Sequence, residues 1–185
     1  MAAEEKDLSV LRRKDRAGDE EFIREFLKHA PFGFLATQRD GQPYVNMNTF
    51  VYDEASHSIY LHTAGNGRLR SDIDAEERVC FAVGEMGRLL PADVAREFSV
   101  EYSGVVVFGR GRVIEDQAFA RDKMHLLIDK YFPHLARGED YRPITPKEVH
   151  EISAYQIQVD QWSGKKKSEA SDFPGAFFYG QPPSK

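Results

Sequence analysis

The stretch Tyr60–Phe81, YLHTAGNGRLRSDIDAEERVCF, reads as a strand, a turn of small residues, a short helix and a second strand. The turn ends at Gly67, and Arg68 and Arg70 follow directly. The first turn of a helix has unpaired N–H groups and carries a partial positive charge. With arginines beside it, this helix start is a candidate phosphate-binding site. The alternative is that both arginines are solvated residues of a helix that binds nothing.

Turn signals and alternating apolar residues around this stretch predict a mainly β chain with inserted helices. Asp40 and Gly41 predict a hairpin turn, and Thr145 begins a helix capping box. Predicted strands cover residues 34–38, 43–52, 58–62, 79–85, 102–114 and 153–160, and predicted helices cover residues 19–29, 68–74 and 116–131. Glycines inside the fifth strand indicate bends. Six strands fit a closed barrel better than a βαβ sheet, and the pattern alone fits an α+β sandwich equally well.

Length and composition predict one ordinary globular domain over residues 1–185. We expect residues 1–18, which are highly charged, to form a mobile arm, and the aromatic tail, residues 168–185, to pack. The net charge of −5 argues against binding nucleic acid, and no apolar run is long enough to cross a membrane. The N-terminus lacks the apolar core of a secretory signal, so the expected location is cytoplasmic.

Cysteine and histidine usage gives no support to a metal site. The single cysteine, Cys80, excludes an internal disulfide and a cysteine-based zinc site. His125 and His134 are too far apart for a pair of ligands on one helix, and His150 has no partner nearby in the sequence. We therefore expect no metal.

Three motifs of the deciding stretch resemble a known family: Tyr60-Leu61-His62-Thr63-Ala64, Gly67-Arg68 and Arg78-Val79-Cys80-Phe81. Their order is similar to that of the FMN-binding split-barrel proteins related to pyridoxamine 5'-phosphate oxidase, and most similar to the nitroimidazole-resistance branch. Further segments that resemble the branch lie at residues 12–16, 33–37, 40–45, 50–53, 102–109 and 163–165. The resemblance implies a six-stranded Greek-key split β-barrel that binds FMN.

The resemblance also implies roles for the residues of the turn. Thr63 and Arg68 match positions that hold the FMN phosphate. Leu69 stands where the family usually has lysine, which weakens the grip on the phosphate or transfers it to Arg70. His62 matches a histidine that lines the active site, where it could donate a proton during two-electron reduction or only pack on the cofactor.

Residues on two other strands complete the implied flavin site. Asn48, Thr49 and Phe50 match a strand that runs beside the isoalloxazine ring, although Met47 replaces a proline that the branch often has. Trp162 matches a tryptophan that some family members place against the partner's flavin, and Lys165 could reach the phosphate across a dimer interface. The alternatives are a core tryptophan and a solvated lysine.

The implied function is that of an FMN-dependent oxidoreductase, a homodimer that reduces nitroimidazoles or other small oxidants by two electrons. An alternative is a split-barrel protein that binds flavin, deazaflavin or haem without turnover of its own, with His62 as the candidate haem ligand. Pyridoxamine 5'-phosphate oxidase activity itself is disfavoured, because lysines but no arginine follow Trp162 to bind a second phosphate.

Overall fold

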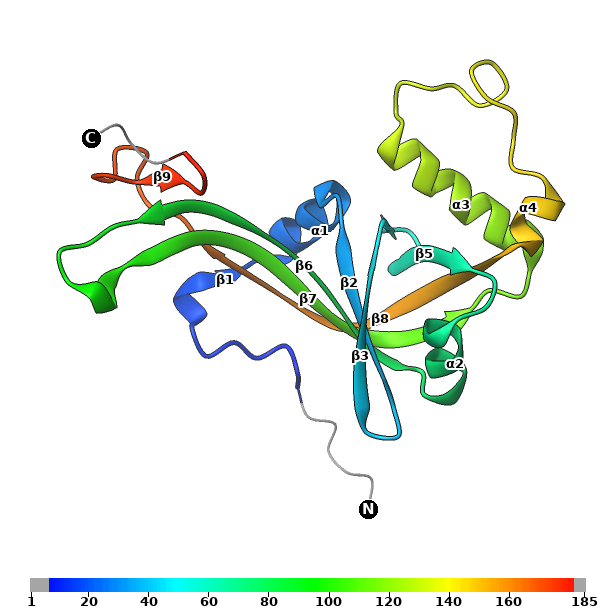
Figure 1. The fold of residues 1–185 in the computed structure, drawn as a ribbon, viewed down its shortest axis with the longest axis horizontal. Coiled ribbons are helices and arrows are strands. Elements are labelled where there is room, and N and C mark those ends of the chain that lie inside the picture. Colours follow the sequence, from blue (N-terminus) through cyan, green and yellow to red (C-terminus); the bar gives the residue numbers. More distant parts are fainter. Residues whose placement is uncertain (1–6, 182–185) are drawn as a thin grey trace.

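The computed structural model describes residues 7–181, which form one antiparallel sheet with four α-helices around it (Figure 1). The strand order is β3-β2-β6-β7-β8-β5-β4, with β1 paired to β8 and β9 paired to β6. The strands are β1 (Ala17–Gly18), β2 (Gly33–Arg39), β3 (Gln42–Asn48), β4 (Val51–Asp53), β5 (Ser58–Ala64), β6 (Arg78–Leu90), β7 (Ser99–Val113), β8 (Ile152–Lys167) and β9 (Phe177–Phe178). The helices are α1 (Glu20–His29), α2 (Arg68–Ala75), α3 (Gln117–Tyr131) and α4 (Pro146–His150).

The predicted class, mainly β with inserted helices and a split barrel, is confirmed, whereas the strand count and the closed barrel are not. The order ends at β3 and β4, so the sheet is not closed over the described residues. The strand predicted at residues 43–52 is divided between β3 and β4. Phe50, at the division, donates its backbone N–H to the Tyr131 hydroxyl at 3.0 Å rather than to a neighbouring strand. Two short strands, β1 and β9, were not predicted.

The three strands β6, β7 and β8 are longer than the sequence predicts and extend beyond the barrel as an arm (Figure 1). Arg88 organises this arm. Its guanidinium forms two hydrogen bonds to Glu101 and donates to the carbonyls of Glu169, Ala170 and Ser171. The bonds from Arg88 to Glu101 hold the pKa of that carboxyl at about 2. The bonds to the three carbonyls attach the start of the tail to the arm. Within the described residues the tail pairs through β9 with β6 of its own chain, while the side chains of Phe178 and Tyr179 stay exposed.

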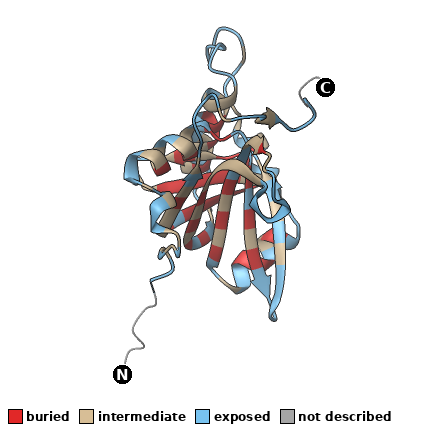
Figure 2. Cartoon of the chain, turned by 90° about the vertical axis from the view of Figure 1, so that its left-hand side faces the viewer, coloured by how far each residue is buried: buried red, intermediate tan, exposed pale blue. Residues whose placement is uncertain are grey.

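The main core lies between the inner face of the sheet and α1, where Figure 2 shows the buried positions along the strands. Asp19 caps α1 as predicted, accepting the N–H of Phe22 at 2.8 Å. Within the predicted arm, residues 7–18 make contacts with β8. The N–H of Leu8 donates to Gln161, and β1 pairs with β8. Residues 1–6 of the predicted arm and 182–185 of the predicted tail lie outside the described residues.

Helices α3 and α4 pack beside β5 and β8 and enclose a second, smaller apolar cluster (Figure 1). The predicted capping box is present: Thr145 accepts the N–H of Glu148, and Glu148 accepts the N–H of Thr145. Among residues 7–181, no helix is long and apolar enough to cross a membrane.

Gly109 lies where β7 shifts its register against β8, at one of the glycines predicted to bend this strand. A Cβ atom at Gly109 would lie 2.1 Å from the carbonyl oxygen of Gln158, a clash with the backbone of the neighbouring strand. At Gly84 in β6, a Cβ atom would lie 3.5 Å from the Ser103 carbonyl oxygen, an ordinary contact.

We therefore expect Gly109→Ala to lower the free energy of unfolding by about 1–3 kcal/mol, because two paired strands must move apart. The measurement is urea unfolding followed by circular dichroism. Gly84→Ala is the matched control and should stay within about 0.5 kcal/mol of the wild type. Equal unfolding midpoints for the two variants would contradict this account of the bulge.

Candidate functional site

The N-terminus of α2, where the sequence predicts a phosphate-binding turn, begins at an uncapped glycine. Gly67 precedes the helix and has no side chain, so the first N–H groups receive no hydrogen bond from a side-chain cap. A Cβ atom at Gly67 would meet nothing within 4 Å, which shows that the space beside this turn is free. Leu69 and Ile73 on the opposite face of α2 are buried in the main core and fix the helix on the barrel. Leu69, at the position where lysine is common, therefore points away from the open turn.

Arg68 lies between α2 and β3. Its guanidinium carbon stands 4.5 Å from the centre of the Tyr44 ring, in a cation–π contact. Its Nε atom is 3.5 Å from a carboxylate oxygen of Asp72, one helical turn further on. About half of the side chain, 49%, remains exposed to solvent. Arg68 is thus held in place on two sides and accessible on the others.

Arg70 is directed elsewhere. Its guanidinium donates to the hydroxyl of Ser153 at 3.1 Å and pairs with Glu115 at 3.2 Å. Residues two apart on a helix point in different directions, and these contacts place Arg70 against β8 rather than beside Arg68. The structure therefore does not bring the two arginines together.

His62 and Thr63 occupy opposite faces of β5, because successive side chains of a strand alternate. The Thr63 hydroxyl donates to the Ala64 carbonyl at 3.1 Å and lies 3.1 Å from the hydroxyl of Tyr155, a core residue. His62 faces the helices instead. Thr63 therefore contacts the core through Tyr155, whereas His62 lies on the side of the strand that faces α3 and α4.

His62 borders a cavity of about 480 Å³ between β5, α3, α4 and the segment that joins the helices. The wall is mostly apolar, and its residues are His62, Met124, Leu127, Ile128, Tyr141, Arg142, Ile144, Glu148 and Ile152. Two polar atoms in this wall, His62 Nδ1 and the Tyr141 hydroxyl, are buried without a hydrogen-bond partner among the described residues. Burial lowers the pKa of His62, so its ring is neutral at pH 7.

The three predicted residues at the end of β3 differ in exposure. Asn48 is half-buried and donates its amide to Asn46. Thr49 is exposed. Phe50 is fully buried, with its ring centre 4.8 Å from that of Phe81. The Phe50 side chain is therefore part of the core, and of these three residues Asn48 and Thr49 have side chains within reach of solvent.

Trp162 and Lys165 lie on β8, apart from Arg68. The indole N–H of Trp162 donates to Glu20 at 2.9 Å, and the indole ring packs against Tyr52 and His57. The Lys165 ammonium lies 5.4 Å from the centre of the Tyr102 ring. Within one chain, the predicted site residues are thus distributed over several places.

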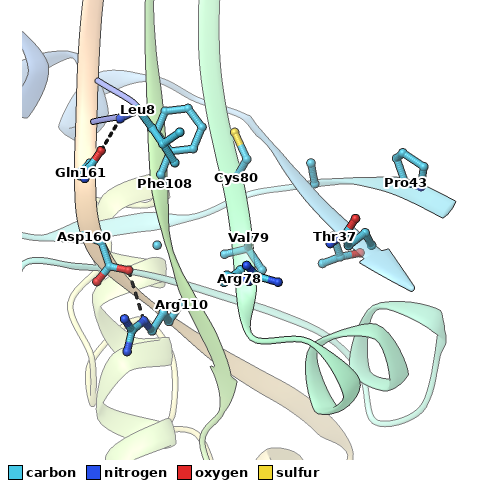
Figure 3. A pocket seen from close by; sticks show the side chains of 13 residues that line it. Leu8, Thr37, Pro43, Arg78, Val79, Cys80, Phe108, Arg110, Asp160 and Gln161 are labelled. Carbon is cyan, nitrogen blue, oxygen red and sulfur yellow. Dashed lines mark hydrogen bonds and ion pairs between the residues drawn. The ribbon is translucent and has the colours of Figure 1, made fainter. Parts of the chain in front are cut away.

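A separate pocket of about 360 Å³ lies on the outer face of β2, β6, β7 and β8 (Figure 3). None of the predicted site residues lines it. Leu8, Cys80 and Phe108 form much of its apolar wall, and Arg110 at its edge pairs with Asp160 at 3.4 Å. Burial raises the pKa of the Cys80 thiol, which makes it a weak nucleophile.

Sequence reasoning did not single out Tyr44, Asp72 and Tyr141, although all three contribute to the surroundings described above. The spacing of Arg68 and Asp72, four residues apart on a helix, was a local signal that could have identified the second residue. Tyr44 and Tyr141 come from distant segments and have no such signal.

Comparison with known proteins agrees with this architecture. The family model described as Pyridoxamine 5'-phosphate oxidase matches residues 19–166. Among curated proteins, no significant match was found.

Three solved structures illustrate the fold. The flavocytochrome Anf3 from Azotobacter vinelandii superposes with a TM-score of 0.77 at 22% identity, covering 95% of this chain and 86% of its own. An FAD- and heme-binding protein from Mycobacterium smegmatis superposes with a TM-score of 0.73 at 21% identity, covering 92% of this chain and 77% of its own. A proposed 5-nitroimidazole antibiotic resistance protein from Bacteroides thetaiotaomicron superposes with a TM-score of 0.66 at 20% identity, covering 80% of this chain and 84% of its own. Because the family model spans most of the sequence and these structures share its fold, the chain belongs to the pyridoxamine 5'-phosphate oxidase-like split-barrel family.

Proposed function

We propose that the protein is a cytoplasmic, FMN-binding oxidoreductase that acts as a homodimer and reduces nitroimidazoles or other small oxidants by two electrons. The observation that carries the proposal is the open N-terminus of α2 with Arg68 held beside it. This arrangement offers backbone N–H groups, the helix dipole and a guanidinium to one anion. The names of two structural relatives, a flavocytochrome and an FAD- and heme-binding protein, support a flavin as the ligand.

The residues at this turn fit a flavin phosphate. The Thr63 hydroxyl already donates to a carbonyl and retains acceptor capacity, so in a complex it must rotate to donate to phosphate. Arg68 needs no such change, because half of its side chain faces solvent. A bound flavin supplies the electron transfer, and the protein supplies position and electrostatics. A deazaflavin carries its phosphate on the same kind of chain and is the closest alternative ligand.

An exposed apolar face supports the homodimer. Phe34 and Met47 are cross-strand partners on the β2–β3 hairpin, and Val45 lies on the same face, paired with Ala36. Their exposed fractions are 42%, 60% and 51%. Adjacent large apolar side chains at this level of exposure are typical of a protein–protein interface. A second copy on this face would also supply the residues, such as Lys165, that one chain places far from Arg68.

The first test is the visible absorption spectrum of the purified protein with added FMN, combined with size-exclusion chromatography. We expect flavin bands that co-elute with a dimer. Arg68→Ala should weaken FMN binding by about tenfold or more, since a charge-assisted contact to phosphate is lost. Arg121→Ala on the exposed side of α3 is the control and should bind like the wild type. Wild-type protein that takes up no FMN would contradict the proposal.

The proposed reductase activity assigns His62 the role of proton donor. A donor must be protonated, and burial lowers the pKa of this ring below its ordinary value of about 6.5. Turnover that depends on His62 should therefore increase as the pH falls from 8 to 5 and level off below the lowered pKa.

The measurement is NAD(P)H-driven reduction of a nitroimidazole by FMN-loaded protein across this pH range. We expect His62→Ala to keep FMN and to lose both the turnover and its pH dependence. His134→Ala, which changes an exposed histidine, should retain both. Unchanged rates in His62→Ala would assign the ring a packing role only.

Haem binding at His62 is the second candidate function. The observation that favours it is the apolar cavity of about 480 Å³, in which the His62 ring has no hydrogen-bond partner among the described residues. Histidine in an apolar pocket is a common axial ligand of haem iron. The proposal takes further support from two structural relatives, a flavocytochrome and an FAD- and heme-binding protein.

Haem titration distinguishes this candidate. If His62 ligates the iron, the added haem should develop a sharp Soret band that is lost in His62→Ala and kept in His134→Ala. FMN binding should persist in both variants, because the phosphate contact proposed for Arg68 does not involve His62. The same Soret band in wild type and His62→Ala would reject His62 as the ligand.

A further inference from the structure

The carboxylate of Asp72 is fully buried at the base of the open turn of α2. One of its oxygens accepts a hydrogen bond from the Thr37 hydroxyl at 3.0 Å and lies 3.5 Å from Nε of Arg68. The other oxygen has no hydrogen-bond partner among the described residues. An ionised carboxylate in such a place is costly unless a cation compensates it. In this structure the compensating cation is Arg68, whose outer half is in solvent.

This pairing determines how the Arg68 guanidinium is presented. Nε lies 3.5 Å from a carboxylate oxygen of Asp72, and the guanidinium carbon lies over the Tyr44 ring, 4.5 Å from its centre. Because the contact with Asp72 is made through Nε, the two terminal nitrogens are left for a ligand. A planar fork held in this way can bind two oxygens of a phosphate at once, with little loss of side-chain entropy on binding.

The other residues of the first turn of α2 cannot take over this task. Leu69 is buried in the core, and Arg70 is bonded to Ser153 and Glu115. The orientation of Arg68 thus decides how strongly this helix start holds an anion.

We propose that Asp72 is a positioning residue for phosphate recognition: through Nε it orients Arg68 so that the outer edge of the guanidinium meets the phosphate of the flavin at the N-terminus of α2. The inference rests on the proposed flavin function and deepens it. Thr37 holds the carboxylate from β2, so the recognition unit extends from Thr37 through Asp72 to Arg68. A purely structural role, in which Asp72 only ties α2 to β2, is the competing explanation.

The experiment compares the affinities of FMN and riboflavin, two flavins that differ only in the phosphate. Both are measured by fluorescence quenching on the full chain, for the wild type and for Asp72→Asn. Asparagine keeps the shape of the side chain and its acceptor for Thr37. We expect Asp72→Asn to weaken FMN by about tenfold, or ~1.4 kcal/mol, and to leave riboflavin within about twofold of the wild type.

Arg68→Lys provides a second variant that does not disturb the core. Lysine keeps the charge but lacks Nε and the planar fork, so it should also lose FMN affinity while keeping riboflavin. Adding Asp72→Asn to Arg68→Lys should then cause little further loss, because the two residues act as one unit. Fully additive losses would overturn the proposal.

The remaining outcomes separate this inference from the flavin assignment. Equal weakening of FMN and riboflavin in Asp72→Asn, with a lower melting temperature, would show a structural role and overturn the inference. Unchanged or tighter FMN binding in that variant would overturn it as well, since the carboxylate would then only repel the phosphate. Wild-type protein that binds neither flavin would overturn the proposed function and the inference together.

Discussion

The pairing of β8 with β5 on one side and β7 on the other is the constraint on which the rest of the structure depends. Its register sets His62 opposite Ala154 and Thr63 opposite Ser153, and so fixes which face of β5 each side chain occupies. Because β5 ends at Ala64, the same pairing also positions Gly67 and the start of α2, which follow it directly in the chain. On the β7 side, the bulge beside Gly109 bends the strands enough to wrap the main core. A shift of this register by one residue would move His62 and Thr63 each to the opposite face of the sheet.

Local features of the fold could be predicted because they depend on neighbouring residues. The Asp19 cap, the hairpin at Asp40 and the Thr145 capping box each need only a few adjacent positions. The extensions of β6 and β8 could not be predicted in this way. Gly84, Met86 and Gly87 interrupt the apolar alternation of β6, and what sustains the strand there is Arg88, which reaches Glu101 and the distant tail.

The candidate site shows the same division between local and distant information. The motif around Gly67 located an open helix start, and the structure places Arg68 beside it. The sequence could not show that Arg70 turns to Ser153, or that Tyr44 covers Arg68, because both contacts depend on pairing between segments far apart in the chain. The roles of Asn48, Thr49, Phe50, His62, Thr63, Arg68, Arg70, Trp162 and Lys165 toward a flavin stay predictions until a complex is measured.

The arm described above is continuous with the barrel, since the same strands form both. The 13 residues of β6 correspond to about 40 Å of extended chain, which carries Cys80 on the barrel and Arg88 on the arm. The strand is paired with β7 along this length, and the register of the pair shifts between Met86 and Leu89. The direction of the arm relative to the barrel therefore depends on that irregularity, since a β-bulge bends the strands that carry it.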